Sequence, residues 1–457
     1  MAKIVLINPP VLGKKFTREG RCQSDENTWL DTFPPVTLAS IAACLRENNE
    51  VKILDCIGSK IGYEKFFNVI KDFNPEYAVI TTSTPTIIND VGIAEKIKNG
   101  TDSKIIMYGE HVTAMYKQLM QKYPWIDFLV LGESETPIIN IVNGTPKSKG
   151  VASIDWDGGI WHEPDLDKLP IPAYDLLPPY YFPLTGEKWM FVRSGRGCPG
   201  NCTYCVTPLM SGKMTRYHSP DYMMKQFRFL YKLGIKVWMF HDDIATLDKK
   251  RMYEICDLLV KEGMNKTCKW FCTTRVDWFD SELAKKMKAA GCKMVSFGIE
   301  SGSQEVLNMN RKGITLEQTR KAVKAAKENG IKTIGHFILG LPGSDEKVLE
   351  DTSKFARELG LDFAQFYIAT PFPGSEFYKL AEKNGWLLNK SWNEVEQASP
   401  SISYPNLSSK SIEYWRRKAY RDFYLRPHAV MSLLSMMSVK QILKTPLYML
   451  KFKNLIK

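Results

Sequence analysis

The sequence has no apolar run close to the roughly 20 residues that a membrane-spanning helix needs. It also has no internal repeat and no low-complexity tract, and Lys3 leads directly into a short apolar run instead of a signal peptide. These absences exclude a repeat architecture and an integral membrane protein, and they favour a protein kept in the cytoplasm. With 457 residues, of which 44% are hydrophobic, the chain is long enough for two or three globular domains.

The ten cysteines are not typical of a disulfide framework, because such frameworks belong to short secreted chains and not to a long chain in a reducing compartment. Three of them are clustered, at Cys198, Cys202 and Cys205, and the other seven are scattered. The cluster indicates metal or redox chemistry, whereas scattered cysteines are typical of small core residues.

The positive charge is concentrated at one end of the chain. The net charge is +12, and residues 408–457 carry +9 of it. A local basic and apolar tail favours a membrane surface or an anionic substrate over nucleic acid, so we expect no nucleic-acid partner. We expect residues 411–426 to form a helical cap and residues 429–457 to contact a membrane surface peripherally.

The first 145 residues alternate short apolar runs with helical patterns, which predicts a parallel α/β sheet. Five strands are typical of a flavodoxin-like (Rossmann-type) domain, whose ligands bind beyond the carboxyl ends of the strands. Residues 146–188 include a proline-rich stretch and are predicted to be a linker. The expected strands are 3–8, 51–54, 77–81, 104–108 and 128–131.

A second alternating series occupies residues 189–395 and predicts six βα units, which make a partial (β/α)6 TIM barrel. Functional residues of such barrels lie in the loops after the strands, so the two sheets are predicted to present their ligand faces to one another. Residues 396–457 are predicted to be a helical, basic C-terminal extension. The expected barrel strands are 189–193, 237–240, 269–273, 294–299, 333–339 and 363–369.

The clustered cysteines lie in the loop after the first barrel strand, in the segment Gly195-Arg-Gly-Cys-Pro-Gly-Asn-Cys-Thr-Tyr-Cys205. Three thiolates can hold three irons of a 4Fe–4S cluster and leave the fourth iron open to another ligand. A structural zinc site is the alternative, but it needs four ligands, and His218 lies thirteen residues beyond Cys205. The spacing therefore favours a 4Fe–4S cluster on Cys198, Cys202 and Cys205.

This three-cysteine motif, with Tyr204 just before the last cysteine, resembles the radical S-adenosylmethionine (SAM) superfamily. The resemblance implies that the open iron binds SAM and that an electron donor such as ferredoxin or flavodoxin supports its reductive cleavage. The product would be a 5′-deoxyadenosyl radical, which abstracts hydrogen from an unactivated carbon. We expect Arg275 to hold the carboxylate of SAM and Glu300 to accept from its ribose or ammonium group, unless the two side chains pair with each other. The expected SAM contacts are Tyr204, Asp242, Arg275, Glu300 and Gly340.

The N-terminal domain resembles the cobalamin-binding domain of one subclass of that superfamily, through short motifs after its third, fourth and fifth strands. These motifs are Thr81-Thr-Ser-Thr-Pro85, Tyr108-Gly-Glu-His-Val-Thr113 and Leu131-Gly-Glu-Ser-Glu-Thr136. Many such domains carry Asp-x-His-x-x-Gly after the first strand, but residues 8–13 of this chain contain no histidine. If cobalamin binds, cobalt is expected to lack that ligand; the alternative is a domain that has lost cobalamin. The expected cobalamin contacts are Ser83, Thr84, Gly109, His111, Gly132 and Glu133.

Residues 17–22 and 34–39 resemble the branch that contains anaerobic magnesium-protoporphyrin monomethyl ester cyclase and radical enzymes of hopanoid and archaeal lipid synthesis. In that segment Arg18, Arg21 and Cys22 either face the cavity between the domains or lie on a solvated surface loop. The resemblance implies an enzyme that methylates, cyclises or couples an unactivated carbon of a lipid or tetrapyrrole. A non-catalytic cobalamin-binding or sensory protein is the alternative, and the complete cysteine motif and Glu300 favour the enzyme. No residue that donates to or quenches a substrate radical can be named from the sequence.

Overall fold

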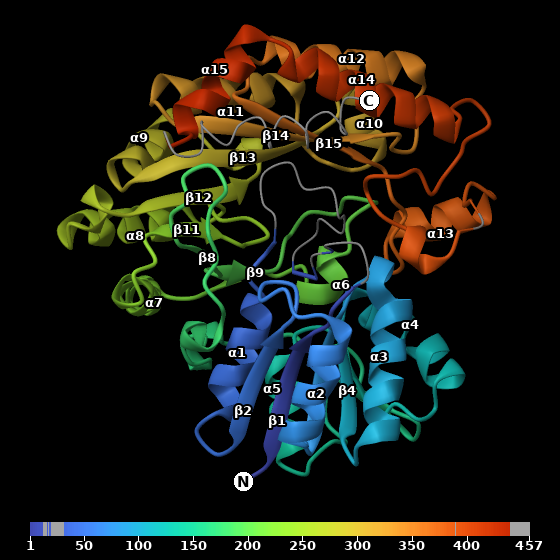
Figure 1. The fold of residues 1–457 in the computed structure, drawn as a ribbon. Coiled ribbons are helices and arrows are strands. Elements are labelled where there is room, and N and C mark those ends of the chain that lie inside the picture. The colour runs from blue at the N-terminus through green and yellow to red at the C-terminus, as the bar shows by residue number, and fades with distance from the viewer. Residues whose placement is uncertain (12–15, 17, 20–31, 389, 439–457) are drawn as a thin grey trace.

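The computed structural model describes residues 1–11, 16, 18–19, 32–388 and 390–438. Two α/β units face each other across the middle of the molecule, with the N-terminal unit in blue and the second unit in green to orange (Figure 1). The two-unit architecture predicted from the sequence is confirmed.

The N-terminal unit is a sheet in the order β2-β1-β3-β4-β5-β6-β7, whose first five strands are parallel. Five of the six residues of β1 are buried, because helices cover both faces of the sheet. The strand order reverses between β1 and β3, which is where doubly wound sheets bind ligands. The strands are β1 (Lys3–Asn8), β2 (Glu50–Asp55), β3 (Tyr77–Thr82), β4 (Lys104–Gly109) and β5 (Phe128–Val130). The helices are α1 (Val36–Leu45), α2 (Tyr63–Phe73), α3 (Ile87–Gly100), α4 (Glu110–Lys122) and α5 (Glu135–Val142).

The segment predicted to be a linker is more structured than its prolines indicate. Its first part forms β6 (Val151–Ser153), which pairs antiparallel with β5, and β7 (Trp156–Asp157), which pairs antiparallel with β6. These strands are two and three residues long, too short to give a readable hydrophobic pattern. Further along, Tyr174 and Phe182 are buried in the core of the second unit. The segment therefore joins both cores and is not a loose connection.

The second unit is an open, six-stranded parallel sheet in the order β15-β14-β13-β12-β11-β8, which confirms the partial barrel. Several helices begin at a capping carboxylate; the side chain of Asp345, for example, accepts a hydrogen bond from the backbone N–H of Val348. The strands are β8 (Trp189–Val192), β11 (Val237–Phe240), β12 (Lys269–Thr274), β13 (Cys292–Glu300), β14 (Lys332–Leu339) and β15 (Phe363–Ile368). The helices are α7 (Pro220–Lys232), α8 (Lys249–Lys261), α9 (Ser281–Ala289), α10 (Gln304–Met309), α11 (Leu316–Glu328) and α12 (Glu346–Glu358).

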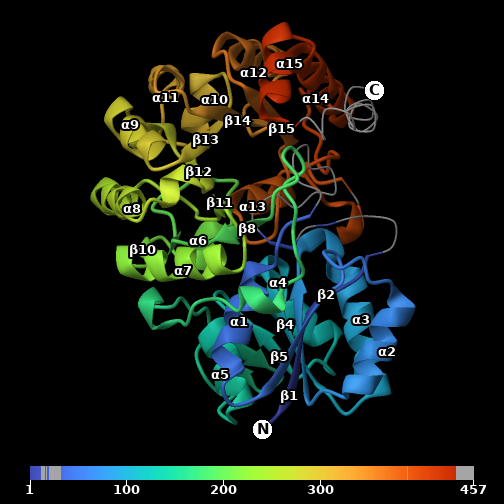
Figure 2. The same cartoon turned by 60° about the vertical axis from the view of Figure 1, so that its left-hand side comes forward.

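The C-terminal helices cover the outer edge of this sheet (Figure 2). On α14 (Ser409–Tyr424), the hydroxyl oxygens of Tyr420 and Tyr424 accept hydrogen bonds from backbone N–H groups of β15, each at 3.1 Å. The helix thus satisfies backbone N–H groups at the free edge of β15 and protects this edge from pairing with another chain. The helix predicted for this stretch is therefore a cap on the barrel.

The next helix, α15 (Pro427–Met436), also packs on the barrel, because Ala429 and Ser432 are buried. Residues 439–457, with five of the tail's lysines, lie outside the described residues. None of the helices within the described part of the chain is long and apolar enough to cross a membrane. The predicted membrane contact of the tail thus stays a prediction. The buried residues of α15 pack on the barrel.

Candidate active site

A cavity of about 410 Å³ lies between the carboxyl ends of the two sheets. The N-terminal unit contributes the loops after β4 and β5, and the barrel contributes its inward-facing side chains and the cysteine loop. Of the predicted residues, the cavity is lined by Cys205, Tyr204, Asp242, Arg275, Glu300, Gly109, Gly132 and Glu133.

The cysteine loop is bracketed by a short antiparallel pair, β9 (Gly195–Arg196) and β10 (Arg216–Tyr217). The backbone N–H of Gly200 donates to Sγ of Cys198 and that of Thr207 donates to Sγ of Cys205, both at 3.4 Å. A Cβ atom built on Gly200 would lie 3.2 Å from Sγ of Cys198 and 3.9 Å from Sγ of Cys202. Backbone donors directed at these sulfurs and a bare glycine between two of them suit a sulfur-ligated cluster.

Two neighbouring carboxylates after β11 fix the ends of this loop. Asp242 is buried and accepts hydrogen bonds from the backbone N–H groups of Ser194, at 2.6 Å, and Gly195, at 3.0 Å. Asp243 accepts from the backbone N–H of Gly197 at 2.9 Å and from the hydroxyl of Thr207 at 3.1 Å. Burial raises the pKa of Asp242, and the hydrogen bonds oppose that rise. Although Asp242 lines the cavity, its oxygens are occupied by the loop, so the structure indicates a positioning role.

A zinc site is not supported. His218 stacks on Tyr222 with ring centroids 3.8 Å apart, and its Nδ1 lies 3.2 Å from Asp167. Within the described ranges, no three His, Cys, Asp or Glu side chains are grouped so that they could hold a single metal ion. A four-iron cluster does not need such a grouping, because its cysteines bind different irons. Five of the scattered cysteines are buried as predicted: Cys56, Cys256, Cys268, Cys272 and Cys292.

Beside the cysteines lie the side chains expected to contact SAM. Arg275 donates twice to Asp277, with both distances 2.9 Å, and Glu300 pairs with Lys312 at 2.7 Å. The alternative in which Arg275 and Glu300 pair with each other is therefore wrong. Burial raises the pKa of Tyr204 well above its usual value, and the neighbouring Glu300 raises it further. Lys312 could not be predicted, because nothing in the sequence shows that the loop after α10 folds back onto the end of β13.

Glu300 has a strained backbone. It ends β13 with a φ angle of +70°, next to an irregularity in the pairing of β13 with β14. Such a conformation costs about 1–3 kcal/mol for a residue other than glycine, and it is typically found where function requires it. By contrast, Gly340 is not part of the cavity lining; a Cβ atom there would lie 2.9 Å from Ile412 of α14. Its predicted SAM contact stays a prediction, and the structure shows close packing against α14 at this position.

Some of the residues predicted to contact cobalamin line the cavity, and others do not. Gly109 and Gly132 line the cavity with φ angles of +135° and +86°, and a Cβ atom on Gly109 would lie 2.2 Å from the backbone oxygen of Thr82. Ser83, Thr84 and His111 do not line the cavity. His111 packs edge-on against Trp392 with centroids 4.9 Å apart, and burial lowers its pKa to about 4. The sequence could not show that residues 392–394 fold over this loop.

An ion-pair network joins the two units at the edge of the cavity. Arg196, two residues before Cys198, pairs with Glu135 at 2.6 Å and with Glu133 at 3.2 Å. Arg216 also pairs with Glu133, at 2.6 Å. Burial raises the pKa of Glu135, but Arg196 outweighs this and lowers it to about 2. The network fixes the cysteine loop against the loop after β5, and Glu133 is therefore engaged by arginines.

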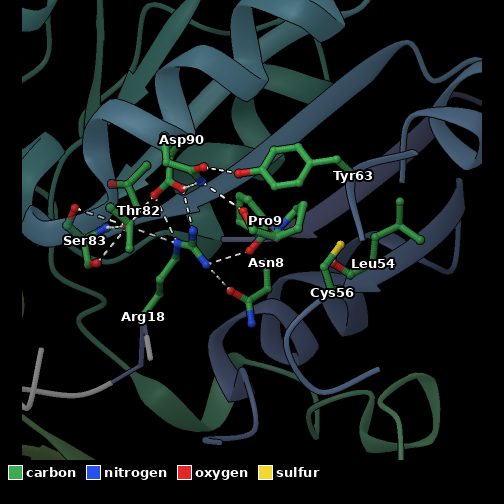
Figure 3. Close-up of polar contacts among 12 residues, drawn as sticks. Asn8, Pro9, Arg18, Leu54, Cys56, Tyr63, Thr82, Ser83 and Asp90 are labelled. Atoms are coloured by element: carbon green, nitrogen blue, oxygen red, sulfur yellow. Dashed lines mark hydrogen bonds and ion pairs between the residues drawn. The ribbon is translucent and has the colours of Figure 1, made fainter. Parts of the chain in front are cut away.

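A second buried ion pair lies at the switch point between β1 and β3 (Figure 3). Arg18 pairs with Asp90 of α3 at 2.5 Å, and both side chains are at most 1% exposed. The guanidinium also donates to the side-chain oxygen of Asn8 and the backbone oxygen of Pro9, both at 2.9 Å, and to Thr86 at 3.1 Å. The surface-loop alternative is wrong for Arg18, which reaches the cavity lining. The predictions for Arg21 and Cys22 fall outside the described residues.

Two facing parallel sheets, with a glycine-rich three-cysteine loop at their shared cavity, define the class of a radical SAM enzyme. Two family models match the chain: the Radical SAM superfamily over residues 192–356 and the B12 binding domain over residues 28–142. An uncharacterized methyltransferase of Pyrococcus horikoshii is 36% identical over 409 residues, which cover 87% of this chain and 89% of the relative. The anaerobic magnesium-protoporphyrin IX monomethyl ester cyclase of Rubrivivax gelatinosus is 28% identical, over 77% of this chain and 67% of the cyclase.

Among solved structures, the radical SAM methyltransferase TsrM of Kitasatospora setae, with cobalamin and a [4Fe–4S] cluster bound, superposes with a TM-score of 0.69. That match covers 96% of this chain and 90% of TsrM at 16% identity, so it concerns the fold. The chain belongs to the radical SAM superfamily, in the family of cobalamin-dependent methyltransferases and cyclases that carry a B12-binding domain before the radical SAM domain.

The enzyme's cofactors are accordingly a 4Fe–4S cluster, SAM and cobalamin, and the residues present fit them. The backbone donors at Cys198 and Cys205 suit the cluster. Gly109 lines the cavity with its backbone, and the close approach of Thr82 leaves no room for a side chain there. A bulky planar group can lie close to such bare backbone. In addition, Nε of Arg196 is buried without a hydrogen-bond partner among the described residues, although the side chain lines the cavity. A buried N–H group without a partner can donate a hydrogen bond to a carbonyl oxygen of a bound ligand.

Proposed function

We propose that this enzyme transfers a methyl group to an unactivated carbon of a lipid or a tetrapyrrole. The observation that carries the proposal is a single cavity that adjoins the cysteine loop, the ends of the N-terminal strands and an apolar barrel interior. When bound, the cluster and SAM supply a radical that removes hydrogen, and cobalamin supplies methyl-transfer chemistry. The protein's own part is to hold these groups in line and to exclude water.

The site residues fall into three sets in this proposal. Cys198, Cys202 and Cys205 hold the cluster, and Asp242 and Asp243 keep their loop in place. Tyr204, Arg275, Glu300 and Lys312 surround SAM. Gly109, Gly132 and the Arg196–Glu133 pair border the cobalamin.

The apolar wall of the cavity supports an apolar substrate. Aromatic and aliphatic side chains enter from the barrel strands, from the segment before β8 and, for Phe33, from the segment before α1. Ligand pockets of this size are lined mainly in this way. They are Phe33, Phe182, Leu184, Phe191, Met239, Met294, Ile334, Ile338 and Phe363.

Methyl transfer is favoured over ring closure because the relative from Pyrococcus horikoshii, which matches nearly the whole chain, is named a methyltransferase. The cyclase of Rubrivivax gelatinosus supports ring closure as the second candidate. A purely sensory protein does not need a complete cysteine loop or the carboxylates that support it.

Two partners complete the proposal. A reduced ferredoxin or flavodoxin supplies the electron for SAM cleavage. A membrane surface presents a lipid substrate. The exposed Leu425, at the end of α14, and Val430, Met431 and Leu434, on α15, lie just before the basic residues 439–457. Apolar side chains beside lysines are typical of interfacial contact.

The test uses SAM with a deuterated methyl group and protein reconstituted anaerobically with iron, sulfide and cobalamin. Lipid and tetrapyrrole extracts are supplied separately, and products are examined by mass spectrometry. We expect a deuterated methyl group in one extract, together with 5′-deoxyadenosine and S-adenosylhomocysteine. Formation of 5′-deoxyadenosine without S-adenosylhomocysteine would favour ring closure, and formation of neither would favour the non-catalytic alternative.

A further inference from the structure

Five lysine or arginine side chains of the described residues line the cavity, and four of them are firmly paired. Each of the four has a carboxylate within 2.9 Å. The pairs are Arg18–Asp90 at 2.5 Å, Arg196–Glu135 at 2.6 Å, Lys312–Glu300 at 2.7 Å and Arg275–Asp277 at 2.9 Å. The fifth, Arg193, contacts a carboxylate of the described residues only at 3.5 Å, that of Glu19. Most of its five N–H donors therefore have no partner among the described residues.

Arg193 is placed by the end of β8. It follows Val192, which pairs with Phe240, the last residue of β11, so that Arg193 and His241 emerge side by side. Both line the cavity, and the side chain of Arg193 is 21% exposed within it. Arg275 emerges from β12 on the side of the cysteines, where it lies close to Gly200. Arg193 is thus a different cation from the one beside the cluster.

An apolar wall lies next to Arg193. Phe191, two residues earlier, packs edge-on against Phe33 with centroids 5.1 Å apart and lies 4.3 Å from the ring of His241. Leu184 and Phe182 line the same cavity. A loosely paired guanidinium against an apolar wall is a recognition element for a ligand that is mainly apolar but ends in an acid.

Among the described residues, the carboxylate in direct contact with Arg193 is that of Glu19, and it is engaged elsewhere. Glu19 accepts hydrogen bonds from the backbone N–H of Thr37 at 2.8 Å and from its hydroxyl at 3.1 Å. Burial raises the pKa of Glu19, so its charged form is costly in this place. Its position is set by the adjacent Arg18, whose guanidinium is fixed in the cage around Asp90 (Figure 3). Glu19 therefore borders the site without filling the donors of Arg193.

We propose that Arg193 is a specificity residue that binds an anionic group, a carboxylate or a phosphate, at one end of an apolar substrate. This inference rests on the proposed function and narrows its substrate class. A porphyrin propionate and a lipid acid group share this chemistry, and both are acids attached to a large apolar body. His241, beside Arg193, supplies a second polar contact for the same group.

The test measures binding and not turnover. Holoenzyme carrying cluster and cobalamin is dialysed to equilibrium against protoporphyrin IX or its dimethyl ester, and against palmitate or methyl palmitate. We expect at least one acid to bind about tenfold or more tightly than its ester, because a charge-assisted hydrogen bond is lost on esterification. Arg193→Gln removes the preference, Arg193→Lys restores part of it, and the matched control Arg228→Gln, on the outer helix α7, leaves it unchanged.

The porphyrin and palmitate arms identify the source of the acid, and a preference in either arm that depends on Arg193 supports the proposal. Equal binding of acid and ester, no binding of either acid, or a preference that survives Arg193→Gln would overturn it. Loss of bound cobalamin from Arg193→Gln, read from the visible spectrum, would also overturn it, since the arginine would then serve the cofactor. If the acid preference depends on Arg193 but no labelled methyl group is transferred, the proposed function fails while the binding site stands.

Discussion

Replacing Glu135 with Gln removes the charge that holds Arg196 across the interface between the two units. The Glu135 side chain is 1% exposed and that of Arg196 is 5% exposed, so the solvent screens their attraction little. A carboxyl whose pKa falls from 4.5 to about 2 on folding contributes about 3 kcal/mol of stability at neutral pH. The loss of one partner from a buried ion pair typically costs a similar 3–5 kcal/mol.

The pH dependence follows from the direction of this shift. Because the folded pKa is lowered, the contribution of Glu135 is complete well above pH 4.5 and declines as the pH falls from about 4.5 toward 2. The difference in unfolding free energy between wild type and Glu135→Gln is therefore expected to be about 3 kcal/mol at pH 7 and about 2 kcal/mol at pH 3.5.

Urea titrations followed by tryptophan fluorescence measure this difference at each pH. The control is Glu413→Gln, which breaks an exposed pair with Arg417 one turn along α14 and is expected to cost less than about 1 kcal/mol. A loss below 1 kcal/mol for Glu135→Gln at pH 7 would refute the reasoning. So would a difference that stays constant down to pH 3.5, because the charge of Glu135 would then not be its source.

Glu300→Gln is expected to keep the cluster chromophore but to weaken SAM binding by about tenfold or more, measured by equilibrium dialysis; unchanged affinity would remove Glu300 from the SAM site. The electron paramagnetic resonance spectrum of the cob(II)alamin form is expected to lack nitrogen coupling from a protein histidine, because His111 is packed against Trp392. A nitrogen triplet that becomes a doublet when the histidines of the protein are labelled with 15N would contradict this. Full-length protein is expected to co-sediment with anionic liposomes at low salt and to be released at high salt. A chain that ends at Ser438 is expected to bind more weakly and to keep its cluster. Failure of both forms to sediment would speak against a membrane-bound substrate.

The parts of the fold that repeat a strong local pattern could be predicted from the sequence. The eleven expected strands are found because buried parallel strands are continuous apolar runs, and the cysteine loop is recognisable because its spacing is local. That the two sheets face each other with their carboxyl ends could also be predicted, because the ligand loops of such sheets lie at the carboxyl ends of the strands.

Contacts between distant segments could not be predicted. Arg18 and Asp90 are 72 residues apart, and only the folded loop shows that the arginine is buried and not solvated. His111 has the same sequence context whether it faces the cavity or packs under Trp392, and the packing is decided by a segment about 280 residues later. Lys312, in the loop after α10, and Arg193, after β8, were missed because a lysine or arginine in a loop has no local feature that separates a cavity side chain from a surface one.

The measurement that tests the central claim most directly is the formation of 5′-deoxyadenosine from SAM by the reduced, anaerobically reconstituted enzyme. Wild type is compared with Cys198→Ala, Cys202→Ala and Cys205→Ala, and with Cys256→Ala as a control at a buried core cysteine. We expect wild type and the control to form 5′-deoxyadenosine and to show the brown iron–sulfur absorbance, and the three loop variants to lose both. Full iron content and undiminished 5′-deoxyadenosine in the loop variants would contradict the assignment of the cluster and, with it, the function proposed for this enzyme.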